Sequence, residues 1–177
     1  MAPVQTIVQT VRLILRRHRL DDFATYATYR ADPQLMRYFR SGPIKEEDAW
    51  SGFRGIFGHW ELMGYGNWAI EERASGRYIG NLGFTDKKRV TSHPASGAPE
   101  MGWLLCAAAQ GKGYATEAIN AALAWARDHF GQGARVVCVI DTDNIASQHV
   151  AARVGFRQFA DVDDGRYKRF VYERIFA

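Results

Sequence analysis

The stretch from Gln110 to Ala115, QGKGYA, combines residue types that could hold an anion. Gly111 and Gly113 stand just before residues 114–130, whose apolar side chains recur at helical spacing and predict the clearest helix of the chain. The first N–H groups of a helix have no intrahelical acceptor, and the helix dipole places partial positive charge there. Because glycine has no Cβ, a phosphate can come close to these N–H groups. The turn is therefore predicted to bind a phosphate.

Three phosphate-binding patterns can be compared with this turn. The P-loop, G-x-x-x-x-G-K-S/T, fails because Cys106 stands at its first glycine and Gly113 at its Ser/Thr position. The dinucleotide fingerprint, G-x-G-x-x-G/A, matches weakly because Thr116 occupies the third small position. The pattern Q/R-x-x-G-x-G/A is satisfied at every fixed position, by Gln110, Gly113 and Ala115. The third pattern fits best.

The elements around the turn must bring it to one edge of a sheet. Residues 100–106 and 135–141 are predicted strands on either side of the turn and its helix. A helix that crosses between two neighbouring strands makes those strands parallel. Ligands of such sheets bind beyond the carboxyl ends of the strands, where the turn at 110–115 lies.

The remaining segments predict one mixed α/β domain over residues 1–177, with no repeat and no linker long enough to divide it. The segment 87–99 is predicted as a loop, because it is polar and contains two prolines. Strands are predicted over 10–17, 65–72, 77–86, 155–159 and 168–176, and helices over 20–33, 43–60 and 143–155.

The composition excludes several classes of protein. The formal net charge of +4 is mildly basic and favours anionic ligands, but no basic stripe indicates nucleic acid. Cys106 and Cys138 lack the spacing of a metal site or a disulfide framework, so no metal is expected. No apolar run approaches the roughly 20 residues needed to cross a bilayer. We expect a cytoplasmic protein with neither a membrane nor a nucleic-acid partner.

Two further motifs accompany the turn in the right order. EMGWLL precedes it, and DTDNIASQHVAARVGF follows it with Asn144, Ser147, Gly155 and Phe156 in register with the pattern D-x-x-N-x-x-S-x-x-v-x-x-x-x-G-F. With these motifs and its element order, the chain resembles the GCN5-related N-acetyltransferase (GNAT) superfamily. It is most similar to the branch that contains the ribosomal-protein alanine acetyltransferases, the RimJ/RimL-like enzymes.

The resemblance implies a fold and a cofactor. The fold would be a single GNAT-type domain, with a mixed sheet of about seven strands, a splayed parallel pair and helices on both faces. The cofactor would be acetyl-coenzyme A (acetyl-CoA), the acyl donor. Its binding residues would be Gln110, Gly111, Lys112, Gly113, Tyr114 and Ala115 at the pyrophosphate, and Trp103, Leu104, Leu105 and Asn144 along the pantetheine arm.

The implied reaction is direct attack of a primary amine on the thioester. It requires a base that removes a proton from the ammonium and an acid that protonates the leaving sulfur. By resemblance, Ser147 is the candidate acid and Glu100 the candidate base, acting through a water. The alternatives are that Ser147 satisfies local backbone groups and that Glu100 pairs with a basic residue.

The sequence indicates the acceptor amine less clearly than it indicates the acyl donor. Tyr38, Phe39 and Trp68 could form an aromatic wall at the acceptor side, but they also fit an ordinary core. Acidic residues that would select a polyamine or an aminoglycoside are not concentrated there, which favours a peptide α-amine over other small-molecule amines. The other hypotheses are a catalytically silent acyl-CoA-binding module and a nucleotide-dependent enzyme. The assembly could be a homodimer.

Overall fold

The computed structural model describes residues 6–177. Their strands form a single eight-stranded sheet. The strand order is β1-β2-β3-β4-β5-β6-β8-β7, and every neighbouring pair is antiparallel except β5 and β6. The strands are β1 Val8–Gln9, β2 Leu13–Arg16, β3 Asn67–Glu72, β4 Tyr78–Thr85, β5 Glu100–Leu105, β6 Arg135–Asp141, β7 Arg157–Asp163 and β8 Lys168–Ile175.

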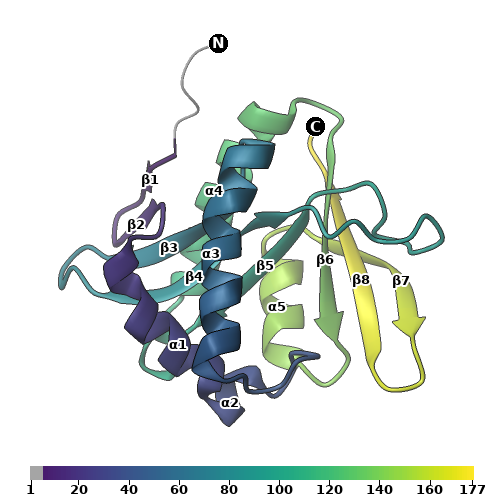
Figure 1. The fold of residues 1–177 in the computed structure, drawn as a ribbon. Helices are drawn as coiled ribbons and strands as arrows, with labels where there is room; N and C mark the ends of the chain where they lie inside the picture. The colour runs from purple at the N-terminus through teal and green to yellow at the C-terminus, as the bar shows by residue number, and fades with distance from the viewer. Residues whose placement is uncertain (1–5) are drawn as a thin grey trace.

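The helices connect these strands and cover the sheet. In Figure 1, α1 and α3 lie in front of β3 and β4, and α4 lies further from the viewer. The α-helices are α1 Phe23–Ala31, α2 Pro33–Met36, α3 Glu46–Met63, α4 Tyr114–Phe130 and α5 Ile145–Arg153, and short 3-10 turns span Leu20–Asp22 and Ala107–Ala109. None of the helices described is long and apolar enough to cross a lipid bilayer.

The mixed α/β fold with its parallel central pair is confirmed, and helix α4 spans the predicted residues. The strand absent from the prediction is β1, which is too short to leave a sequence pattern. The segment 20–33, predicted as one helix, is instead divided at Asp32. Its carboxylate accepts hydrogen bonds from the backbone of Gln34 and Leu35, so Pro33 begins a new helix, α2.

The core lies on both faces of the sheet. In β4, the residues from Tyr78 to Gly80 and from Leu82 to Phe84 are all buried. Because successive residues of a strand point to opposite faces, this run shows that both faces are covered. On one face Trp68 packs edge-on against Trp60 of α3 and Trp125 of α4, so these two helices share one aromatic cluster.

Candidate active site

A cavity of about 730 Å³ opens where the two parallel strands separate. Residues of both β5 and β6 line it, together with the turn before α4 and the first turns of α5. Its other walls come from the end of α1, the segment 34–40 and the loop 86–99. Segments that are far apart in the sequence therefore meet around one space, with the carboxyl end of β5 at one side of it.

The separation of β5 and β6 leaves backbone groups free along the cavity. The two strands are paired only at Glu100 and Val137, next to a hydrogen bond from the Val137 N–H to the Pro99 carbonyl at 3.1 Å. Because backbone groups of alternate residues point the same way, Trp103 presents its N–H and C=O to the gap. The Leu105 carbonyl, further along that edge, accepts a hydrogen bond from Gln110 Nε2 at 3.0 Å.

The turn before α4 displays a row of free N–H groups. Within the described part of the chain, the backbone N–H groups of residues 111–116 have no hydrogen-bond acceptor. Gly111 and Gly113 have φ values of 73° and 78°, in the left-handed region that suits glycine. Gly113 is also the N-cap of α4, whose dipole adds partial positive charge at the same place. A row of free N–H groups at a helix N-terminus can bind a phosphate, so the phosphate site stays a prediction for this turn.

An ion-pair network that sequence reasoning missed holds this turn in place. The Arg12 guanidinium lies 2.6 Å from a Glu117 carboxylate oxygen and donates to the Lys112 carbonyl at 2.9 Å. It also covers the ring of Tyr114, whose hydroxyl donates to Glu72 at 2.7 Å. Arg12 and Glu117 are 105 positions apart, so no local pattern joins them.

Glu117 is charged in this network. Burial opposes the charge, but hydrogen bonds from Thr10 and from the backbone and side chain of Arg12 outweigh it and lower the pKa of Glu117. A carboxylate in the first turn of α4 also interacts favourably with the helix dipole. The β1–β2 segment is thereby fastened to the start of α4.

Lys112 lies on a different wall from the other residues of the turn. Its side chain is exposed and lines a second cavity of about 620 Å³, which the 3-10 turn 20–22, the β3–β4 hairpin and the 3-10 turn 107–109 also line. Tyr114 and Ala109 line both cavities. The cation therefore stands beside the row of N–H groups and not within the main cavity.

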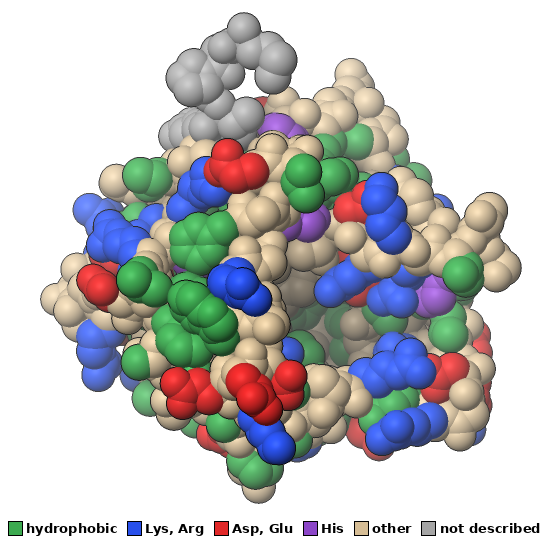
Figure 2. Space-filling view, in the orientation of Figure 1, with side chains coloured by type: hydrophobic (Ala, Val, Ile, Leu, Met, Phe, Trp, Pro, Cys, Tyr) green, Lys and Arg blue, Asp and Glu red, His purple; other side chains and the backbone are tan. Residues whose placement is uncertain are grey.

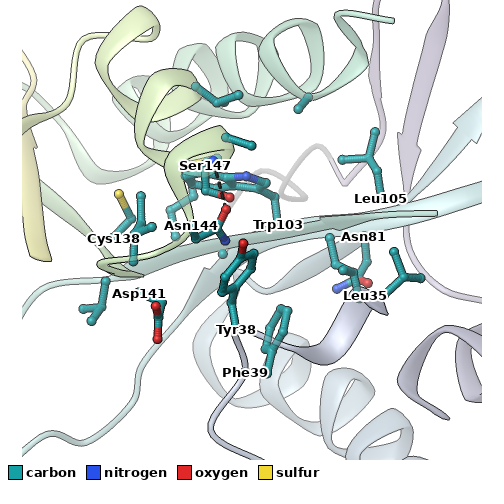
Figure 3. A pocket seen from close by; sticks show the side chains of 18 of the residues that line it. Leu35, Tyr38, Phe39, Asn81, Trp103, Leu105, Cys138, Asp141, Asn144 and Ser147 are labelled. Atoms are coloured by element: carbon teal, nitrogen blue, oxygen red, sulfur yellow. Dashed lines mark hydrogen bonds between the residues drawn. The ribbon is translucent and has the colours of Figure 1, made fainter. Parts of the chain in front are cut away.

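Asn144 and Ser147 lie across the gap from Trp103 (Figure 3). Asn144 is the N-cap of α5, and its Oδ1 accepts a hydrogen bond from the Ser147 N–H at 3.1 Å. Asn144 thus caps the helix that the sequence predicted over 143–155. Ser147 lines the cavity, and among the residues that the structure describes its hydroxyl has no hydrogen-bond partner. This hydroxyl can reorient toward a ligand.

Glu100 is the first residue of β5 and lines the same cavity. Its Oε2 accepts a hydrogen bond from Arg89 Nε at 2.6 Å, so the carboxylate has the basic partner that the sequence left as an alternative. Its Oε1 has no partner within residues 6–177. One oxygen of the carboxylate is therefore available to a water or an amine.

The predicted aromatic wall is only partly assembled. Tyr38 and Phe39 line the cavity, and Figure 3 shows the Tyr38 side chain pointing toward Asn144. Trp68 instead has no exposed surface, lies in the core with Trp60 and does not line the cavity. The prediction that Trp68 faces the acceptor is corrected on that ground: its bulky ring fills the space between the sheet and its helices.

A sheet split between β5 and β6, with a turn of unpaired N–H groups at the carboxyl end of β5, is typical of acyltransferases of the GNAT class. A family model described as "Acetyltransferase (GNAT) domain" matches residues 12–157. The chain therefore belongs to the GNAT acetyltransferase family, in its RimJ/RimL-type branch, and is an N-acetyltransferase that uses acetyl-CoA.

Known relatives agree with this assignment. The chain is 26% identical over 151 residues to the uncharacterized N-acetyltransferase YnaD of Bacillus subtilis, covering 85% of this chain and 82% of that protein. A solved structure from Bordetella pertussis, assigned to the GNAT family, has a TM-score of 0.82 at 28% identity, covering 96% of this chain and 99% of that one.

A second similar structure contains the coenzyme. It is RimL, a ribosomal L7/L12 α-N-protein acetyltransferase in complex with coenzyme A, with a TM-score of 0.77. The match covers 96% of this chain and 98% of that one, at 19% identity. At this identity the likeness shows the shared fold.

Proposed function

We propose that this protein transfers an acetyl group from acetyl-CoA to a primary amine by direct attack, with the α-amine of a peptide as the acceptor class. The observation that carries the proposal is the cavity itself, which joins the anion-binding turn to Ser147 and Glu100 in one space. Acetyl-CoA, when bound, supplies the activated acetyl thioester.

The residues that would hold the coenzyme form a continuous path. The N–H groups of residues 111–116 would bind the pyrophosphate, and Gln110 holds the turn to the end of β5. The free backbone groups of Trp103 would pair with the pantetheine arm, with Leu104 and Leu105 beside it and Asn144 across the gap. Lys112 would add a point charge at the edge of the phosphate site.

Two side chains would move protons. The Ser147 hydroxyl, free of other partners within residues 6–177, would donate a proton to the leaving sulfur. Glu100 would accept the proton of the ammonium at Oε1, directly or through a water, while Arg89 fixes the carboxylate through Oε2. The amine would enter from the side of Tyr38 and Phe39.

The acceptor side also supports an α-amine over a polycation. Among the described residues that line the cavity, the carboxylates are Glu100 and Asp141, and Glu100 is already paired. A polyamine or an aminoglycoside carries several positive charges and needs several carboxylates to bind it. A peptide α-amine carries a single charge at the reacting atom.

The test is release of free thiol from acetyl-CoA with a panel of N-terminal peptides, polyamines, aminoglycosides and amino acids. We expect thiol release that depends on an amine, with the N-acetyl product identified by mass spectrometry. Tight coenzyme binding without acetylation of any amine would contradict the proposal and indicate a silent acyl-CoA-binding module. Acetylation of polyamines in preference to peptides would contradict the acceptor class alone.

A further inference from the structure

The cavity that would receive the amine is strongly cationic. Its described lining contains seven basic side chains against the two carboxylates of Glu100 and Asp141. Figure 2 shows Lys and Arg side chains gathered around the hollow in the middle of this face. The seven are Arg30, Arg37, Arg40, Lys87, Arg89, Arg153 and Arg169.

Part of this charge lies at the acceptor end, far from the phosphate turn. Arg89 pairs with Glu100, the first residue of β5, whereas the phosphate turn follows its last residue. At about 3.3 Å per residue, a strand of this length separates its two ends by roughly 17 Å. Coenzyme phosphates on the turn therefore leave Arg89 without a phosphate neighbour.

The segment after α2 and the β7–β8 hairpin contact each other beside the cavity. Arg40 lies 3.6 Å from the Asp164 carboxylate, and the Tyr167 hydroxyl donates to the Arg40 carbonyl at 3.1 Å. Tyr167 and Arg40 are 127 positions apart in the sequence. Guanidinium groups from three separate segments thus line this one cavity: Arg40, Arg89 and Arg169.

Arg169 lies close to a neighbour of Arg40 and to a neighbour of Arg89. Backbone N–H groups of Tyr167 and Arg166 lower the pKa of Asp164, and the charges of Arg40 and Arg169 lower it further. Burial lowers the pKa of His93, and the charges of Arg89 and Arg169 also lower it. The field of Arg169 therefore reaches the neighbours of Arg40 on one side and of Arg89 on the other.

Arg169 differs from Arg40 and Arg89 because no described carboxylate forms an ion pair with it. Arg40 and Arg89 each form an ion pair, but within the described chain Arg169 forms none, and its buried Nη2 has no hydrogen-bond acceptor. Arg30, near the end of α1, lines the same cavity and likewise has a buried Nε without an acceptor. A buried guanidinium N–H that lacks an acceptor is costly, and a carboxylate is the acceptor that fits it best.

Resting on the proposed acetyltransferase activity, we propose that the acceptor amine carries a carboxylate of its own and that Arg169 binds this carboxylate, with Arg30 as the second cation. The acceptor is then an amino acid or a peptide with an acidic side chain near its N-terminus. The chemistry shared by both sources is a primary amine with a carboxylate a few bonds away. Arg169 is a specificity-determining residue.

The test compares acceptors that differ only in the carboxylate. One arm uses the peptide amides Ala-Glu-Ala and Ala-Gln-Ala, and the other uses free alanine and alaninamide, all at saturating acetyl-CoA. We expect kcat/KM for the carboxylate member to exceed that of its neutral partner by about tenfold or more in at least one arm. The arm that shows the preference identifies the source of the carboxylate.

Variants then assign the preference to Arg169. In Arg169→Met the preference should fall to about threefold or less through a higher KM for the carboxylate acceptor, with kcat/KM of the neutral one unchanged. Arg169→Lys should retain part of the preference because the charge stays. Arg157→Met is the matched control, since Arg157 is an exposed residue of β7 that does not line the cavity.

A binding titration keeps this inference separate from the proposed function. Calorimetry without acetyl-CoA should show that Ala-Glu-Ala amide binds the wild type and binds Arg169→Met about tenfold more weakly. Equal use of both acceptors by the wild type, or equal loss of both in a folded Arg169→Met, overturns the inference. If no amine is acetylated at all, the proposed function fails and the calorimetric comparison alone decides the carboxylate site.

Discussion

The two ends of the cavity are built in different ways. The proposed donor end consists of backbone N–H groups on a short turn, and Arg12 and Glu117 fasten that turn to the rest of the fold. The acceptor end consists of long side chains, such as Arg40 and Arg169, from segments that meet only in the folded chain. A donor site built from backbone groups depends on the conformation of the turn and tolerates few substitutions. The specificity of an acceptor site built from side chains can be changed by single substitutions.

The largest effect should follow from Gly113→Glu, which attacks the donor end directly. The variant forces a side chain into the left-handed conformation of Gly113 and places a carboxylate where a phosphate would bind. We expect coenzyme A binding to become undetectable by calorimetry.

Gly133→Glu is the matched control for this change. Gly133 has a φ of 79°, close to that of Gly113, and a Cβ there would meet no atom within 4 Å. The control carries the same strain and the same charge outside the cavity and should bind the coenzyme. Normal affinity in a folded Gly113→Glu variant would show that the turn does not hold the phosphates.

Ser147→Ala should come next, because it removes the proposed acid and leaves the cavity intact. General acid catalysis contributes about 100-fold or more to a rate, so we expect kcat to fall by about that factor. The KM for acetyl-CoA should change little. Ser51→Ala, on the exposed surface of α3, serves as the control. If affinity and turnover fall together, Ser147 is a binding residue only.

The stability of the protein should depend on pH through a histidine buried under helices α1 and α3. His18 is buried among Tyr26 of α1, Phe53 of α3 and Tyr78 of β4, and burial lowers its pKa to about 4. Below pH 6.5 the unfolded chain takes up the proton first, so the free energy of unfolding should fall by about 3 kcal/mol as the pH drops to 4.

His18→Phe keeps a ring among its aromatic neighbours and should remove this part of the pH dependence. The measurement is urea unfolding at several pH values between 4 and 6.5. His149→Gln, at an exposed position of α5, is the control for the loss of one histidine. An unchanged slope in His18→Phe would mean that His18 is not the titrating group.

Arg12→Met should have the smallest effect of the four. The variant removes the contacts to the Lys112 carbonyl and the Glu117 carboxylate but leaves every N–H group of the turn in place. We expect the KM for acetyl-CoA to rise by about tenfold because the turn is less well ordered, with kcat nearly unchanged. Arg127→Met, at the exposed end of α4, should change neither value. A large fall in kcat would place Arg12 at the chemistry itself.

The sequence predicted the turn and helix starts that form the proposed donor end, because the relevant residues are close together in the chain. Gln110, Gly113 and Ala115 lie within one hexapeptide, and Asn144 caps a helix that the pattern also predicted. Such a motif fixes its own local geometry, because the first N–H groups of a helix that follows a glycine turn point outward from the helix N-terminus.

The rest of the site could not be predicted, for physical reasons. The pairs Arg12–Glu117 and Arg40–Asp164 each form only when the chain folds, so no local spacing predicts them. Aromatic residues are ambiguous because a ring suits a core as well as a pocket, and Trp68 proved to be core.

The central claim is that residues 111–116 bind the donor phosphates, and amide hydrogen exchange with and without coenzyme A tests it most directly. Amides without an acceptor exchange fast, so peptides that cover this turn should exchange rapidly in the free protein. We predict that coenzyme A slows exchange at residues 111–116 and at Trp103, with no change in the loop 86–99. Unchanged exchange at the turn, with protection elsewhere, would contradict the account.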